Sequence, residues 1–431
     1  MEKSDMLYLI IGRNPLPNLI AASTRVKVNG KITCIITGGE DGTESIYTNL
    51  KKVIEEKNKG INLNYVTVST SDWDNDQKRL REEFEKSIND REVFELNFTG
   101  GTKVMSSSAC YIFKEVCEEK GADGILSYID GEKEMIFNES TLKSKWNYKH
   151  EDLKKLDETF HITLNDIVNV HMGNEHIEYN EKPYDELLGE KIFNYFVDCD
   201  SDKWRKGIDF LEQFYFDDYK KLVEKVEHKN DDKRDSKTIE IINKMKENGT
   251  AFDKKLNIFE DVSDIDDLAI KNKKINFRFI EAIRGKWFED YIFKIMLELK
   301  SENVIEDVAN SFQLFKKNKN GNKGDTHFEV DLVAYRKYRL FSISITSQEK
   351  ECDAKKKLYE IKLRGKQLGG EENKIVFISL CPESQPLVDE CRNVWDGDEL
   401  KNILIIGVDK FKNIKNELKD FILGVNEHNG K

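Results

Sequence analysis

The sequence predicts an α/β protein with three regions: an open α/β sheet over residues 1–145, a mostly helical region over 146–272 and a second α/β domain over 273–431. Three observations predict this division. The first region repeats an apolar run, a Gly-, Asn- or Pro-containing loop and a helical segment. The middle is dense in charge and carries apolar residues at helical spacing, and the last region returns to apolar, strand-like runs. A chain of 431 residues is also too long for one compact core.

The strands of the first region are continuous apolar runs, which are typical of parallel strands buried on both faces. Each of the first runs ends in a loop of turn-forming residues, and apolar residues then recur at helical spacing. A final pair of strand signals is turned by Asp130-Gly131, a dipeptide favoured in hairpins. The expected elements, in chain order, are strands at 6–11, 32–36, 62–68, 93–96 and a hairpin at 125–137, with helices at 19–22, 45–56 and 104–118.

The most informative run is Asn97-Phe98-Thr99-Gly100-Gly101-Thr102-Lys103, which joins a strand to a helix. A Gly-Gly pair at such a junction lets backbone N–H groups approach an anion, and the helix N-terminus adds a positive dipole. The run matches neither the Walker loop nor the dinucleotide fingerprint, because its glycine spacing differs from both. It therefore indicates either a phosphate-binding loop or an ordinary strand-to-helix turn.

The loops that end the strands share one predicted location. In an open α/β sheet, ligands bind beyond the carboxyl ends of the strands, near the point where the strand order reverses. Loops 12–18, 37–42 and 97–103 all follow predicted strands. Together they predict a site for a phosphate-bearing ligand.

Charge and composition exclude some classes of protein. The net charge of −12 argues against a protein that coats nucleic acid nonspecifically, although 69 Lys and Arg residues can still supply one basic groove. No apolar run approaches the length of a membrane span, and the N-terminus lacks the pattern of a secretory leader. The seven cysteines are scattered and form no C-x-x-C motif. We therefore expect a cytoplasmic protein.

The C-terminal region carries a second chemical signal. A predicted helix over 277–299 contains Glu289, and the apolar strand 328–334 contains Asp331, with Glu329 two residues earlier on the same face. A buried carboxylate is costly unless it is paired or binds a cation. The remaining expected elements are a strand at 340–346, a helix at 353–368 that ends at Gly369-Gly370, and strands at 375–380 and 403–408.

Two sets of motifs resemble a known family. Ile11-Gly12-Arg13-Asn14-Pro15-Leu16-Pro17 and Thr99-Gly100-Gly101-Thr102-Lys103 resemble the CARF sensor domain of the CARF nucleases that accompany type III CRISPR antiviral systems. The C-terminal order of helix, strand, strand, helix and strand resembles the PD-(D/E)XK, or restriction-endonuclease-like, nuclease core. The resemblance implies a Rossmann-like CARF domain, a homodimer, and binding of a cyclic oligoadenylate, most simply cyclic tetra-adenylate, whose two-fold symmetry matches a two-fold dimer.

The resemblance also assigns residues. Catalysis would involve Glu289 and Asp331, which would hold Mg²⁺ or Mn²⁺. Glu329, on the same strand face as Asp331, is expected from that spacing to join them as a metal ligand. The nucleic acid substrate would be DNA, RNA or both. The expected ligand-binding residues are Gly12, Asn14, Gly39, Thr99, Gly100, Gly101, Thr102 and Lys103.

The sequence departs from the nuclease pattern at one place. The strand that normally carries Glu-x-Lys has Ser344 and Thr346 at these positions, and neither residue can replace a carboxylate or a cation. Either the active site is dead, or a lysine and a carboxylate have migrated to the following helix, where Lys357 and Glu360 share one face with Arg364. The alternative role of that face is a set of ordinary exposed ion pairs. The functional alternatives are thus an activated metal-dependent nuclease, an inactive cyclic-oligoadenylate-binding regulator, or a ring nuclease that cleaves its own messenger.

Overall fold

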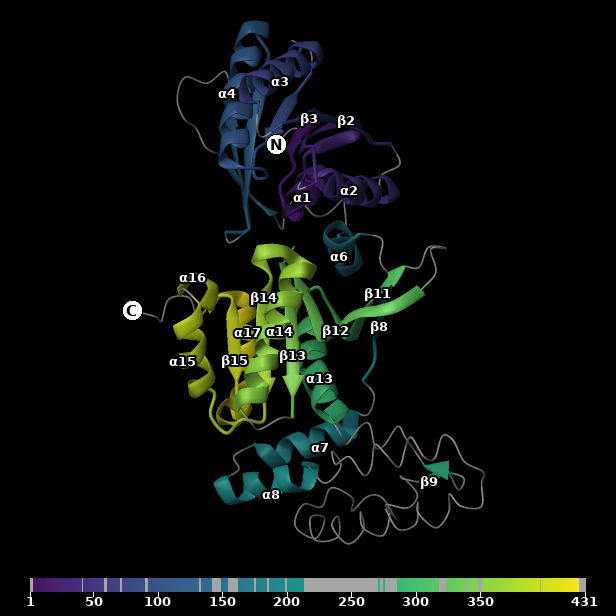
Figure 1. The fold of residues 1–431 in the computed structure, drawn as a ribbon, viewed down its shortest axis with the longest axis vertical. Helices are drawn as coiled ribbons and strands as arrows, with labels where there is room; N and C mark the ends of the chain where they lie inside the picture. Colours follow the sequence, from purple (N-terminus) through teal and green to yellow (C-terminus); the bar gives the residue numbers. More distant parts are fainter. Residues whose placement is uncertain are drawn as a thin grey trace.

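The computed structural model shows two sheet domains stacked along one axis (Figure 1). No helix in the described parts of the chain is both long enough and apolar enough to cross a membrane. The structure describes residues 3–425 except 41, 58–59, 70–71, 90–91, 132, 142–148, 154–161, 174–175, 184–185, 198–199, 213–269, 272–273, 276–284, 318–322, 338, 348–350 and 396.

The N-terminal domain is a seven-stranded sheet in the order β3-β2-β1-β4-β5-β6-β7, which is parallel from β3 to β5 and antiparallel from there on. The order reverses between β1 and β4, which makes their carboxyl ends the switch point of the sheet. Its elements are β1 (Ser4–Ile10), α1 (Leu16–Thr24), β2 (Val26–Thr37), α2 (Glu44–Lys57), β3 (Asn62–Val68), α3 (Trp73–Ser87), β4 (Phe94–Asn97), α4 (Lys103–Lys120), β5 (Gly124–Asp130), β6 (Met135–Ser140) and β7 (Lys149–Asp152).

The strands expected in this domain form close to their predicted positions because their apolar runs are buried on both faces. Tyr8 packs with α3 and α4, and Leu9 packs on the opposite face with α1 and α2. Helix α4 begins at the Thr102 N-cap and ends at Gly121, whose φ of 63° suits glycine. Strand β7 was not expected, and it extends this sheet to Asp152.

The C-terminal domain is a six-stranded sheet in the order β15-β14-β13-β12-β11-β8. Strands β8, β11, β12 and β13 pair antiparallel, whereas β13, β14 and β15 are parallel. Helices α7, α13 and α17 cover one face of this sheet, and α14 and α15 cover the other. Its elements are β8 (His176–Asn180), α7 (Glu186–Phe196), α8 (Ser201–Glu212), α13 (Trp287–Ser301), β11 (Asp307–Lys317), β12 (Lys323–Arg336), β13 (Arg339–Thr346), α14 (Glu351–Gly369), a 3₁₀ turn η3 (Gly370–Glu372), β14 (Lys374–Ser379), α15 (Gln385–Val394), α16 (Gly397–Leu400), β15 (Ile403–Ile406), η4 (Val408–Asn413) and α17 (Ile414–Leu423).

Two strands of this sheet were absent from the expectation. Strand β11 lies between α13 and β12 in the chain, so three antiparallel strands rather than two separate α13 from α14. Strand β8 comes from the segment expected to be mostly helical, and it pairs with β11 at the sheet edge. Much of that middle segment, including 213–269, lies outside the described residues. The short strands β9 (Ile270–Lys271) and β10 (Lys274–Ile275), which follow it, are described and pair antiparallel.

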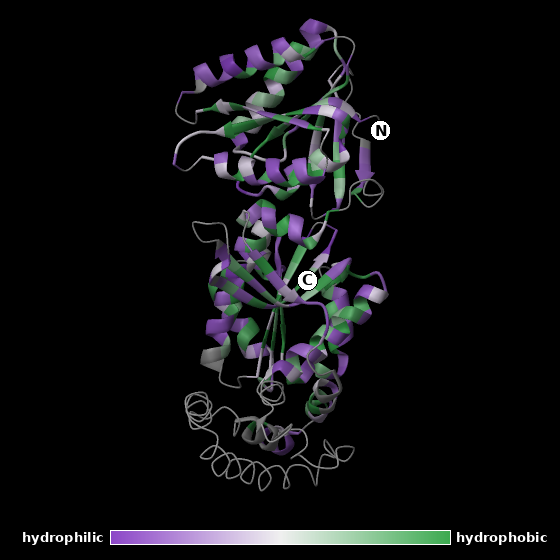
Figure 2. Cartoon of the chain, turned by 90° about the vertical axis from the view of Figure 1, so that its right-hand side faces the viewer, coloured by the Kyte–Doolittle hydropathy of each residue, from purple (hydrophilic) through white to green (hydrophobic). Residues whose placement is uncertain are grey.

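Helix α6 (Leu164–Met172) joins the two domains (Figure 1). Its Thr163–Asp166 capping box fixes its start, and Ile167, Val168 and Val170 are buried in a hydrophobic cluster that contains residues of both sheets. Figure 2 shows apolar strands between helices whose outward faces are polar, as expected for two cores of this kind. The shared cluster gives the domains a packed junction rather than a flexible one.

Candidate functional site

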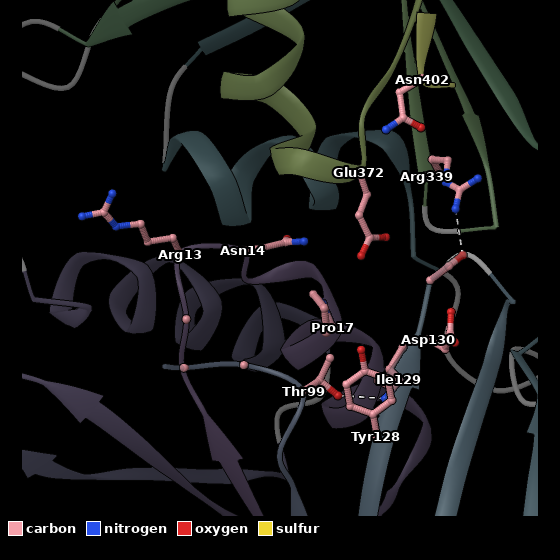
Figure 3. A pocket seen from close by; sticks show the side chains of 14 residues that line it. Arg13, Asn14, Pro17, Thr99, Tyr128, Ile129, Asp130, Arg339, Glu372 and Asn402 are labelled. Carbon is pink, nitrogen blue, oxygen red and sulfur yellow. Dashed lines mark hydrogen bonds between the residues drawn. The ribbon is translucent and has the colours of Figure 1, made fainter. Parts of the chain in front are cut away.

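A cavity of about 490 Å³ lies at the switch point of the N-terminal sheet and reaches the C-terminal domain (Figure 3). The loops after β1 and β4 and the β5–β6 turn provide most of its wall. Strand β13, the η3 turn and the start of β15 provide the rest. The lining residues are Gly12, Arg13, Asn14, Pro17, Thr99, Gly100, Gly101, Tyr128, Ile129, Asp130, Gly131, Arg339, Glu372 and Asn402.

Glycines shape this cavity because the loops after β1 and β4 touch through their backbones. A Cβ atom on Gly100 would lie 2.0 Å from the Ile10 carbonyl oxygen, and one on Gly12 would lie 2.7 Å from the Gly101 nitrogen. Gly101 has a φ of 78°, which disfavours other residues. The two loops therefore meet without side chains between them, and the N-terminus of α4 opens beside the cavity.

Five of the eight expected ligand-binding residues line this cavity: Gly12, Asn14, Thr99, Gly100 and Gly101. Their side chains mainly support the loops. The Asn14 carboxamide oxygen accepts from the Leu16 amide at 3.1 Å, and the Thr99 hydroxyl accepts from the Ile129 amide at 2.8 Å.

The other three expected ligand-binding residues do not line this cavity. Thr102 accepts a hydrogen bond from the Met105 amide at 3.3 Å, so its hydroxyl caps α4. Lys103 is exposed and does not line the cavity, and neither does Gly39, whose φ of 98° serves its own turn. A capping threonine and a phosphate-binding threonine occupy the same position at a helix start, so the ligand-binding role of Thr102 stays a prediction beside its capping role.

A second cavity, of about 190 Å³, lies in the C-terminal domain between β12, β13 and α14. It brings together Glu329, Asp331, Lys357 and Glu360, four residues expected from the sequence to take part in catalysis or metal binding. Its lining residues are Glu329, Val330, Asp331, Ser344, Lys357, Glu360, Ile361 and Arg364.

Asp331 is held from the neighbouring strand. Its Oδ2 accepts from the Ile345 amide at 2.6 Å and from the Ser344 hydroxyl at 3.2 Å. Burial raises the pKa of Asp331, and the Ile345 amide and the charges of Lys357 and Lys286 act against that rise. Ser344, which stands where the family pattern has a carboxylate, therefore orients Asp331.

Glu289 does not line that cavity, but the charge of Asp331 acts on it. Its side chain is 13 % exposed, and burial together with the Asp331 charge raises the pKa of Glu289 to about 7. Lys286 Nζ donates to Glu289 Oε2 at 2.5 Å and to the Ser311 hydroxyl at 3.1 Å. A carboxylate whose pKa is raised by a second carboxylate, next to a lysine, forms a site whose charge a cation would relieve.

Lys286 was not identified from the sequence as a functional residue. It precedes Glu289 by three residues, a spacing that places both on one helix face and that could have indicated the pair. The charges of Glu289, Glu329 and Asp331 raise the pKa of Lys286 against the effect of its burial. The lysine missing from β13 thus has two possible substitutes, Lys357 on α14 and Lys286 at the start of α13.

Glu360 is engaged by its own helix. Arg364 donates to the Glu360 carboxylate, an i,i+4 ion pair, and to the Glu329 carbonyl. The ordinary ion pair considered for this helix face is therefore present, although Glu360 and Arg364 also line the cavity.

The carboxylates fit a divalent ion of the magnesium type. Within the described ranges, no three His, Cys, Asp or Glu side chains come close enough together to hold a metal ion, so Glu289, Glu329 and Asp331 do not form a closed cage. Mg²⁺ is commonly held by only one or two carboxylates, with waters and substrate phosphates completing its shell. Glu289 and Asp331, which repel each other in the protein alone, meet that requirement.

Comparison with known proteins agrees with the N-terminal architecture. Residues 6–166 match the Card1 CARF domain, so this region is a Rossmann-like CARF domain. No curated protein sequence matches the chain.

Solved structures share the fold over nearly the whole chain. Protein VC1899 from Vibrio cholerae superposes with a TM-score of 0.64 at 16% identity, covering 97% of this chain and 98% of that one. Can2 from Sulfobacillus thermosulfidooxidans, in complex with cyclic tetra-adenylate, superposes with a TM-score of 0.62 at 15% identity, covering 97% of each chain. At these identities the similarity establishes a common fold.

Proposed function

Because residues 6–166 form a Card1-type CARF domain, we propose that this protein is a cyclic-oligoadenylate-activated, metal-dependent nuclease of type III CRISPR antiviral defence. One observation carries the proposal: the chain combines a glycine-lined cavity at the switch point of the CARF sheet with a separate cavity lined by Asp331, whose charge raises the pKa of the half-buried Glu289. The complex of Can2 with cyclic tetra-adenylate supports that ring as the activator. The substrate would be DNA, RNA or both.

The topology of the C-terminal domain supports the nuclease part of the proposal. Helix α13 leads into the antiparallel strands β11, β12 and β13, and α14 then crosses to the parallel strand β14. This order resembles the PD-(D/E)XK core, with Glu289 on its first helix and Asp331 on its central strand.

The residues would divide the work as follows. Asp331, oriented by Ser344 and the Ile345 amide, and Glu289 would hold Mg²⁺ or Mn²⁺. The ion, when bound, would offset charge on the scissile phosphate and activate a water. Lys357 would present its ammonium group to a phosphate oxygen beside Asp331. Lys286 would keep Glu289 ionised and in place until the metal ion binds.

A homodimer is part of this proposal because a two-fold ring of phosphates suits a two-fold interface. Helix α4 starts beside the 490 Å³ cavity of the N-terminal sheet, hereafter the nucleotide cavity. It exposes the side chains of Val104 and Tyr111, whose exposed fractions are 58% and 65%. These residues are seven positions apart, so they lie on one face of the helix. Large exposed apolar side chains beside a ligand site are typical of an interface.

We expect Tyr111→Glu to weaken dimerisation at least about tenfold, because a carboxylate would replace an aromatic anchor in the proposed interface. Sedimentation velocity over a range of protein concentrations would measure the shift. Leu423→Glu, at an exposed apolar position in the last turn of α17, is the matched control and should leave the dimer intact. Identical behaviour of the two variants would contradict an α4 interface.

The proposed function is tested by incubating the protein with a plasmid and with single-stranded DNA and RNA, in Mg²⁺ or Mn²⁺, with and without cyclic tetra-adenylate. We expect cleavage that needs both the metal and the messenger. Tight messenger binding by calorimetry without cleavage of any substrate would favour the regulator instead, a reading that Ser344 and Thr346 support. Loss of the messenger itself on long incubation would favour a ring nuclease.

Lys286→Met should lower messenger-activated cleavage about tenfold or more and weaken Mn²⁺ binding near neutral pH, because Lys286 lowers the pKa of Glu289 and a protonated Glu289 cannot hold the ion. Calorimetric titration with Mn²⁺ supplies the second measurement. Lys294→Met is the matched control, since Lys294 lies on the same helix and pairs with Glu190 at 2.7 Å, away from Asp331. Unchanged metal affinity in Lys286→Met would contradict this role.

A further inference from the structure

The nucleotide cavity is not enclosed by the CARF loops alone. Arg339, Glu372 and Asn402 of the C-terminal domain line it as well (Figure 3). Arg339 Nη2 donates to the Gly131 carbonyl at 2.9 Å, and the Glu372 carboxylate lies so close to Gly131 that a Cβ there would be 2.1 Å from its Oε2. The wall of the cavity opposite the phosphate-binding loops is therefore polar and belongs to the other domain.

We propose that this C-terminal wall contacts the activator directly and recognises its adenine bases, with Glu372 as the residue that discriminates. The inference rests on the proposed function, because it assumes a cyclic oligoadenylate in this cavity. The backbone N–H groups of Gly100, Gly101 and the start of α4 would hold phosphates on the opposite side.

The hydrogen-bonding groups of the C-terminal wall favour contact with the adenine bases. An ionised carboxylate only accepts hydrogen bonds, and it repels phosphate. The donors that a cyclic oligoadenylate offers are the exocyclic N6 amines of its adenines and its ribose 2′-hydroxyls. The Asn402 carboxamide both donates and accepts, which suits the adenine edge with its N6 amine and ring nitrogens. The Arg339 guanidinium, which donates to the Gly131 carbonyl in this structure, can also stack on a base or pair with a phosphate.

The position of Glu372 also connects the cavity to the second site. Glu372 ends the η3 turn, which follows α14 directly, and Gly370 packs against Asn14 of the CARF loop and His171 of α6. Helix α14 carries Lys357, Glu360 and Arg364 in the proposed active site, about 9–20 Å along the helix from Gly370. A ligand that engages Glu372 would thus act on a turn that continues directly from the helix lining the second cavity.

The test compares two rings that differ at the base edge. Cyclic tetra-inosinate carries an oxygen where adenine has the N6 amine, so it offers Glu372 an acceptor instead of a donor at that position. We expect the wild-type protein to bind cyclic tetra-adenylate about tenfold or more tightly than cyclic tetra-inosinate in calorimetry. Glu372→Gln, which can donate to that oxygen, should reduce this preference about tenfold.

Arg339→Gln supplies a second measurement with a matched control. Lys337 forms an ion pair with Glu134 across the same domain junction but does not line the cavity. Arg339→Gln should weaken binding of cyclic tetra-adenylate about tenfold or more, whereas Lys337→Met should change it less than about threefold. Equal losses in the two variants would overturn the inference, since docking of the domains rather than ligand contact would then explain both.

The remaining outcomes separate the two proposals. If the wild-type protein binds cyclic tetra-adenylate and Glu372→Gln keeps the wild-type preference between the rings, base recognition by Glu372 is wrong and the proposed function stands. If the wild-type protein binds neither ring, the proposed function fails and the inference fails with it.

Discussion

Asp331→Asn should reduce messenger-activated cleavage by roughly three orders of magnitude, since it removes one of two carboxylates that would hold the catalytic ion. The amide keeps the shape of the side chain and can still accept from the Ile345 amide and Ser344. Initial rates on the best substrate, at saturating messenger and metal, measure the effect. Binding of cyclic tetra-adenylate should remain unchanged, because Asp331 lies in the other cavity.

Stability separates this loss of chemistry from unfolding. Burial disfavours the ionised form of Asp331, and its charge raises the pKa of Glu289. Without metal, Asp331→Asn should therefore melt no lower than the wild-type protein. Asp325→Asn, at an exposed position on the same strand, is the matched control and should cleave normally. Full activity in Asp331→Asn would rule out this site as the catalytic centre.

Arg25→Met should lower the free energy of unfolding of the CARF domain by about 3–5 kcal/mol, because it leaves a buried carboxylate without its cation. Arg25 Nε donates to Glu95 Oε1 at 2.8 Å, and the two side chains are 2% and 0% exposed. Ser127 also donates to the Glu95 carboxylate, at 2.6 Å. For a domain of this size, scanning calorimetry should show a decrease in melting temperature on the order of 10 °C.

The loss of stability in Arg25→Met should come from the unpaired, buried Glu95 carboxylate rather than from the missing ion-pair attraction itself. Lys51→Met removes an exposed i,i+4 pair with Glu55, so it should shift the melting temperature by less than about 3 °C. Adding Glu95→Leu to Arg25→Met should recover much of the loss, since it removes the buried carboxylate. A double variant that is less stable than Arg25→Met would show that the ion pair contributes mainly by its packing or its other hydrogen bonds.

The elements that form where the sequence predicts them are those whose local signals all favour one structure. Strand β3 forms at its predicted residues, and α14 ends at Gly369-Gly370 as expected, because apolar periodicity and glycine stops act over a few neighbouring residues. Strand β11 escaped prediction, and so did β8, which is held by pairing with β11 more than a hundred residues away in the chain. Edge pairing of this kind leaves little trace in a short window of sequence.

By itself, the sequence determined the α/β character of the chain, the CARF region and the glycine loops after β1 and β4. It left open whether Lys357 and Glu360 lie beside Asp331, which the structure brings together. Only the tertiary structure decided that Thr102 caps a helix, that Lys286 pairs with Glu289, and that Arg339 and Glu372 face the CARF loops. The physical reason is the range of the interactions. Backbone preferences and apolar periodicity are written in adjacent residues, whereas a side chain's partner depends on which distant segment packs against it.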